Sequence, residues 1–140
     1  MNLLLGALAL VSSLLAPVQE RPAYAEGQVW EYSTRPEDAG SLIKIQQVEL
    51  SPAGPIYHIS MTGVRIAKNG AQMDAAHLPV SRKTLDASVT RLATPQAAAR
   101  KFPDPQDGIA IWRQDNGGVF TISLSEIAGI IAGQVGSHTE

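Results

Sequence analysis

The stretch that decides the fold runs from Leu42 to Ala67 and reads LIKIQQVEL-SPAGP-IYHISMTGVRIA. Its two outer parts, 42–50 and 56–67, alternate apolar and polar side chains, and a period of two predicts β-strands. The Ser-Pro-Ala-Gly-Pro segment between them is made of turn-forming residues, so we expect a hairpin. The alternation slips by one near Gln46 and again at Gly63, and each slip predicts a β-bulge.

The sequence on either side of this hairpin predicts one strand before it and mainly helices after it. The further strands expected are 28–33 and 119–122, and the helices expected are 81–93, with Ser81 as N-cap, a short one after Thr94, one after Asp104, and a last one after Ser123. Residues 71–80 have no clean period. Strands followed by helices favour the α+β class, with a three- to four-stranded, mainly antiparallel sheet and helices packed on one face.

Composition excludes several classes of protein. The 140 residues contain no cysteine, which excludes a disulfide framework, a thiolate nucleophile and a zinc–thiolate site. The formal net charge of −2 offers no basic surface, so we expect no nucleic-acid partner. The length suits a single domain.

The N-terminus predicts export. Leu3 to Ala16 is an almost unbroken apolar run that would span about 21 Å as a helix, short of the ~30 Å core of a membrane. Ala23-Tyr24-Ala25 then matches the small-x-small pattern of a signal peptidase site. We therefore expect a secretory signal peptide over 1–25 and one periplasmic or extracellular domain over 26–140, with no membrane span after cleavage. A buried N-terminal helix is the alternative, since no Lys or Arg precedes the apolar run.

Several short segments, taken in order, resemble a family of small uncharacterised bacterial proteins. The segments are Gly27-x-Val29-Trp30-x-Tyr32, Thr34-Arg35-Pro36-Glu37, His58-Ile59-Ser60, Gly63-Val64-Arg65-Ile66, His77-Leu78-Pro79 and Gly118-Val119-Phe120-Thr121-Ile122. The resemblance implies one domain of about 100 residues, and it implies no chemistry, because the family has no established activity.

Two histidines are the main candidates for chemistry. His58 lies on the strand 56–67, on the face opposite Ile59 and Met61, where a neutral imidazole could act as a base or a ligand. His77 follows Asp74 by three residues in an expected turn, and with His58 the two could hold a divalent cation. The alternatives are a strand histidine bonded to a neighbour and a loop-fixing histidine. Because this spacing is not specific to metals, we expect no metal and no cofactor.

Two arginines and a tryptophan are further binding candidates. Arg35 lies in a loop beside Trp30, and an arginine near aromatic rings can recognise a carboxylate or a phosphate. The alternative is a local ion pair with the carboxylates that follow it. Arg65 follows the second predicted bulge, so its direction is open. Trp30 is better interpreted as a core residue than as a ligand platform.

Two functions remain open. The first is an exported, non-enzymatic binding or interaction module with an unknown protein or small-molecule partner. The second is a small hydrolase or metal-dependent enzyme centred on His58 and His77. Convergence of the two imidazoles within about 5 Å, with Asp74 or Glu31 nearby, would favour the second function. Ser60 is an unsuitable nucleophile for His58, because residues two apart on a strand are separated by about 7 Å.

Overall fold

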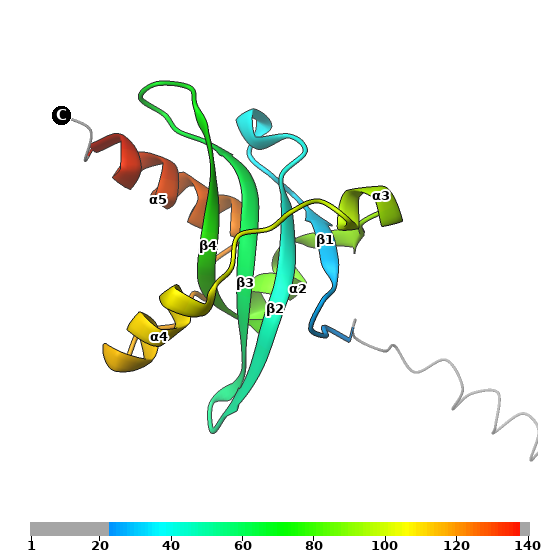
Figure 1. Ribbon diagram of the computed structural model, residues 1–140, viewed down its shortest axis with the longest axis vertical. Coiled ribbons are helices and arrows are strands. Elements are labelled where there is room, and N and C mark those ends of the chain that lie inside the picture. The colour runs from blue at the N-terminus through cyan, green and yellow to red at the C-terminus, as the bar shows by residue number, and fades with distance from the viewer. Residues whose placement is uncertain (1–22, 138–140) are drawn as a thin grey trace, which may run out of the picture.

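Five antiparallel strands form one sheet at the centre of the domain. The computed structural model describes residues 23–137 (Figure 1). The strands are β1 (Val29–Tyr32), β2 (Leu42–Ser51), β3 (Gly54–Arg65), β4 (Gln72–Ser81) and β5 (Val89–Leu92), in the spatial order β4-β3-β2-β1-β5. The predicted α+β class is confirmed, and the sheet has five strands rather than three to four.

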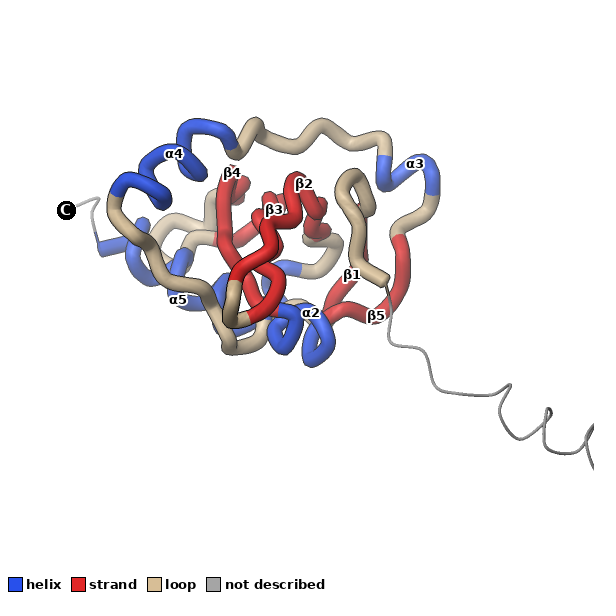
Figure 2. Tube along the Cα trace, turned by 90° about the horizontal axis from the view of Figure 1, so that it is seen from below, coloured by secondary structure: helices blue, strands red, loops and turns tan. Residues whose placement is uncertain are grey.

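Helices cover both faces of this sheet. They are the 3₁₀-helix η1 (Pro36–Asp38) and the α-helices α2 (Arg82–Ser88), α3 (Pro95–Ala98), α4 (Gln106–Gln114) and α5 (Leu124–Ser137). Helices α2 and α5 lie on one face, while α4 and the segment that precedes it cross the other (Figure 2). The prediction that the helices pack on one face is therefore wrong, because Trp112 of α4 packs on His58 on the second face.

The hydrophobic core lies between the sheet and the helices α2 and α5. As predicted, Tyr57, Ile59 and Met61 of β3 share the core face, and each is buried. They pack with Leu85 of α2 and, from α5, with Leu124, Ile127, Ala128 and Ala132. His58 consequently points to the opposite face, which confirms the predicted side of the strand.

Both predicted bulges are present in β2 and β3. The pairing of β2 with β3 shifts register between Ile45 and Gln47, and the pairing of β3 with β4 shifts between Met61 and Val64. Gly63 lies inside the second shift with φ +67°, a conformation that glycine adopts without steric cost.

Strand β4 is one of two strands that the sequence did not predict. Opposite the bulges of β3, the side chains of β4 do not alternate regularly between apolar and polar. Strand β4 also contains Pro79 in its interior. The carbonyl of Pro79 accepts from the Phe120 amide at 2.9 Å, on the edge away from β3, so the N–H that proline lacks would also face that edge. The strand predicted at 119–122 is reduced to a single bridge between Val80 and Phe120.

The helix predicted over 81–93 ends at Ser88. Ser81 caps its start as predicted, accepting from the Thr84 amide at 3.2 Å. The next four residues form β5 instead, because they pair with β1. Leu92 is 52% exposed, so the apolar stripe that suggested a longer helix is not a buried face.

The predicted signal peptide, 1–25, and the alternative N-terminal helix lie outside the described residues except for Ala23 to Ala25. Among the residues that are described, no helix is long and apolar enough to cross a membrane.

Candidate functional site

The two candidate histidines lie side by side on the face of the sheet beneath α4. Pro79 of β4 pairs with His58 of β3, and His77, two residues earlier on β4, is the diagonal neighbour of His58. His58 Nδ1 and His77 Nε2 are 2.8 Å apart, and the ring planes are inclined by only 26°. His77 therefore lies in a strand and not in the turn expected for it, and the two imidazoles converge.

Helix α4 covers the histidine pair closely. The edge of Trp112 packs on the His58 ring at a centroid distance of 4.9 Å. Gly108 lies so close to His77 that a Cβ atom at this glycine would be 2.6 Å from the His77 Cβ. Only a residue without a side chain lets the helix approach this far. Sequence reasoning missed this role of Gly108, and its one signal was a glycine inside a helical segment.

A carboxylate and a guanidinium extend the pair toward solvent. His58 Nε2 lies 3.4 Å from Glu49 Oε1, and Arg113 of α4 donates to the same oxygen at 2.7 Å. The sequence reasoning missed both residues. The position of Glu49 could have been predicted from the bulge near Gln46. This bulge turns the Glu49 side chain of β2 to the face of the sheet on which His58 lies.

The hydrogen-bond directions in this network follow from the carboxylate. An ionised Glu49 can only accept, so Nε2 of His58 carries the proton and donates to it. In a neutral imidazole Nδ1 is then an acceptor, and His77 donates to it from Nε2. Nδ1 of His77, the last atom in this series of hydrogen bonds, then has a free lone pair. We call Arg113, Glu49, His58 and His77 the histidine relay.

Burial keeps both imidazoles of the relay neutral. Desolvation, together with the neighbouring His58, lowers the pKa of His77 to about 4. Desolvation also lowers the pKa of His58, although Glu49 opposes this effect. The hydrogen bond from Arg113 holds the pKa of Glu49 below its ordinary value. At neutral pH the relay therefore contains one ion pair and two uncharged rings.

No nucleophile reaches the relay from Ser60. This side chain is fully buried, and its hydroxyl lies 2.7 Å from the Ala76 carbonyl and 3.2 Å from the Pro103 carbonyl. Its oxygen also accepts from the Gln46 amide group at 3.2 Å. The hydroxyl is thus fully used in holding backbone segments together.

The third residue of the suggested cation site, Asp74, does not join the histidines. Its carboxylate accepts from the Gly63 amide at 2.9 Å. Within residues 23–137, no three His, Cys, Asp or Glu side chains are arranged to hold a metal ion.

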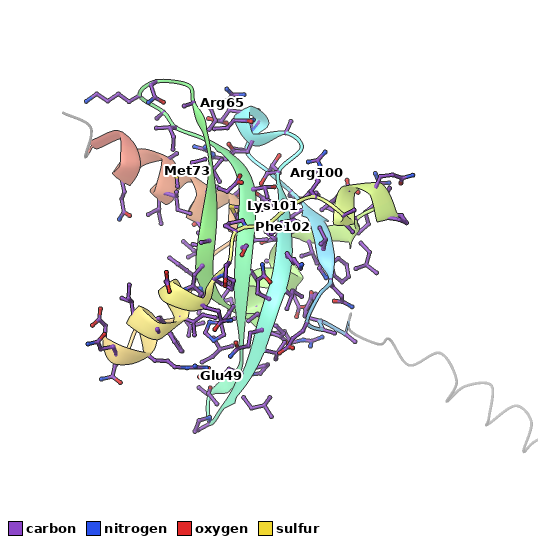
Figure 3. All side chains as sticks on the ribbon, viewed as in Figure 1. Glu49, Arg65, Met73, Arg100, Lys101 and Phe102 are labelled. Atoms are coloured by element: carbon purple, nitrogen blue, oxygen red, sulfur yellow. The ribbon has the colours of Figure 1, made fainter. Side chains whose placement is uncertain are left out.

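Arg35 forms an internal ion pair. It donates twice to the Asp38 carboxylate, at 2.6 and 3.0 Å, and once to the Arg65 carbonyl. Asp38 is completely buried and also accepts from the Arg65 amide at 2.8 Å. This pair is the local ion pair considered as an alternative, and its burial makes it part of the fold. Figure 3 places Arg65 and Glu49 toward opposite ends of the sheet, so the two charged networks are separate.

The remaining candidates also have structural partners. The guanidinium of Arg65 donates to the carbonyl of Gly70. Trp30 is 8% exposed and belongs to the core, as expected.

The chain matches no known family model and no solved structure. The resemblance to a family of uncharacterised bacterial proteins therefore stays a prediction from the sequence.

Proposed function

We propose that the protein is an exported, non-enzymatic binding module and that its histidine relay holds α4 on the sheet. One observation carries the non-enzymatic part. The two facing nitrogens of His58 and His77 bond to each other, and the neighbouring hydroxyl of Ser60 bonds to backbone. The base of the relay thus finds no nucleophile in Ser60, the hydroxyl next but one to His58 on β3.

The surface supports the binding part of the proposal. Two open clefts, of about 390 and 360 Å³, are within the size range in which proteins hold small ligands. Both have mixed polar and apolar linings, which suits recognition of a small molecule or a short peptide.

A small hydrolase is the second candidate, and one observation favours it. Nδ1 of His77 retains a lone pair at the end of a chain ordered by Glu49 and His58, which is how a general base is oriented.

Turnover of an activated ester separates the two candidates. We expect the purified protein and its His77→Gln variant to hydrolyse 4-nitrophenyl acetate at the same rate, with Asp74→Asn as a matched control outside the relay. General-base catalysis contributes roughly 10²–10⁴-fold, so a loss of that size in His77→Gln alone would favour the hydrolase.

Export is supported by the sequence of residues 1–25, and it has its own test. Mass spectrometry of the protein isolated from the periplasmic fraction should show that the N-terminal segment has been removed. A soluble cytoplasmic protein that keeps Met1 would contradict export.

A further inference from the structure

The side chain of Tyr24 fills an aromatic slot at the edge of the core. Its ring meets the rings of Trp30 and Tyr57 edge-on, each at a centroid distance of 5.6 Å. The guanidinium of Arg82 lies 5.0 Å from the ring centre, and the hydroxyl donates to Asp86 at 2.7 Å. We call the space bounded by these four residues the Tyr24 slot. It provides edge contacts, a cation over the ring, and one acceptor for a hydroxyl.

The walls of this slot belong to elements that do not depend on Tyr24. Trp30 lies on β1 and Tyr57 on β3, while Arg82 and Asp86 are one helical turn apart on α2 and form an ion pair at 3.6 Å. Each of these elements is held by the sheet or by the core. The walls should therefore persist when the ring that fills the slot is removed.

The predicted signal peptidase site lies immediately after this residue. Cleavage after Ala25 would remove Tyr24 together with the leader. The residues that follow stay attached to the sheet, because Gly27 donates to the Ile45 carbonyl at 2.7 Å and the Glu26 carboxylate accepts from the Val48 amide at 3.0 Å. The new N-terminus would thus stay beside the slot without filling it.

We propose that cleavage after Ala25 empties the Tyr24 slot, and that the mature protein uses this slot to bind a ligand carrying a phenol ring. The inference rests on the proposed export and names the ligand class of the binding module.

The groups around the slot select a neutral phenol over other rings. A hydrocarbon ring would keep the contacts to Trp30 and Arg82 but would lose the hydrogen bond to Asp86, which would keep only its ion pair with Arg82. A phenolate would place its charge against the Asp86 carboxylate. Burial and this carboxylate raise the pKa of Tyr24 above its ordinary value, in agreement with a protonated hydroxyl.

The first experiment opens the slot in the full chain. We expect Tyr24→Ala to bind p-cresol, measured by calorimetry and by the change in tryptophan fluorescence, and to bind toluene at least tenfold more weakly. The wild-type full chain and Tyr24→Phe keep a ring in the slot and should bind neither probe. Adding Asp86→Leu to Tyr24→Ala should abolish the preference for p-cresol. The assignment would be overturned if Tyr24→Ala bound p-cresol and toluene equally well. It would also be overturned if the wild-type chain bound p-cresol as tightly as Tyr24→Ala does.

The second experiment uses the protein that cells export and does not depend on the variant folding. Its mass gives the N-terminus, and the same titration is then repeated. A folded protein that begins at Glu26 and binds p-cresol supports the proposal. One that begins at Glu26, is folded, and does not bind overturns the slot. If the exported protein retains Tyr24, the proposal that cleavage empties the slot is wrong, whereas the proposed export and the binding module are unaffected.

Discussion

Acidification from pH 7.5 to 5 should destabilise the protein through the histidine pair beneath α4. His77 would take up a proton on Nδ1, the nitrogen with a free lone pair, and this would place a charged ring beside His58 under α4, where burial disfavours charge. The folded protein therefore resists protonation of the pair, whereas the unfolded chain takes up protons near the ordinary histidine pKa. Stability is complete above that value and is lost as the pH falls below it.

The size of this loss follows from the pKa of His77. Burial and the neighbouring His58 lower this pKa from 6.5 to about 4, and linkage over this interval gives an upper limit of about 2 kcal/mol for the loss at pH 5, because solvent screens part of the half-buried ring. For a domain of this length, that limit corresponds to a fall in melting temperature of at most roughly 6–12 °C. Protonation of His58, whose pKa is also lowered, adds to the effect in the same direction.

Thermal unfolding followed by circular dichroism at half-unit steps of pH measures this slope. His77→Gln cannot titrate, so its melting temperature should fall less between pH 7.5 and 5 even if the variant is less stable at pH 7.5. A wild-type melting temperature that does not change over this interval, or a slope identical in the variant, would refute the reasoning.

Three further predictions concern stability measured by urea unfolding. Gly108→Ala should destabilise by about 1–3 kcal/mol, since the new methyl group would meet His77 at 2.6 Å, whereas Gly129→Ala in α5 meets nothing closer than 3.9 Å and should stabilise by about 0.5–1 kcal/mol. An equal effect at both glycines would contradict the close approach of α4. Asp38→Asn should cost about 3 kcal/mol, because the partly buried guanidinium of Arg35 would keep only the more distant Glu37 as a counter-charge, and a cost below ~1 kcal/mol would show that the pair is solvated. Ser81→Ala should cost about 1 kcal/mol through the lost helix cap, and no change would contradict the capping role.

The features that the sequence predicted are those with local causes. The hairpin, its bulges near Gln46 and Gly63, and the cap at Ser81 follow from the period of apolar residues and from turn and cap chemistry within a few positions. Strand β5 depends instead on pairing with β1, which is far away in the sequence. Four residues with partly exposed side chains leave no periodic signal for such a strand.

The histidine relay was predictable in part. The period of β3 correctly placed His58 opposite the core, but the convergence of His77 depends on β4, whose interior proline and bulged partner concealed it. His58 is buried because α4 crosses the second face of the sheet. Helix α4 can lie this close because Gly108 has no side chain to meet His77. The position of Glu49 beside His58 could have been predicted, because the bulge near Gln46 places the Glu49 side chain on the same face of the sheet as His58.

The central claim is that the histidine pair is a neutral, mutually bonded support for α4 and not a catalytic base exposed to substrate. Correlation spectra of the imidazole ¹⁵N nuclei across a pH titration test it most directly. The account predicts that both rings carry their proton on Nε2 at pH 7 and that His77 stays neutral at pH 5. A His77 ring that titrates at or above the ordinary value of 6.5, or a His58 ring protonated on Nδ1, would contradict it.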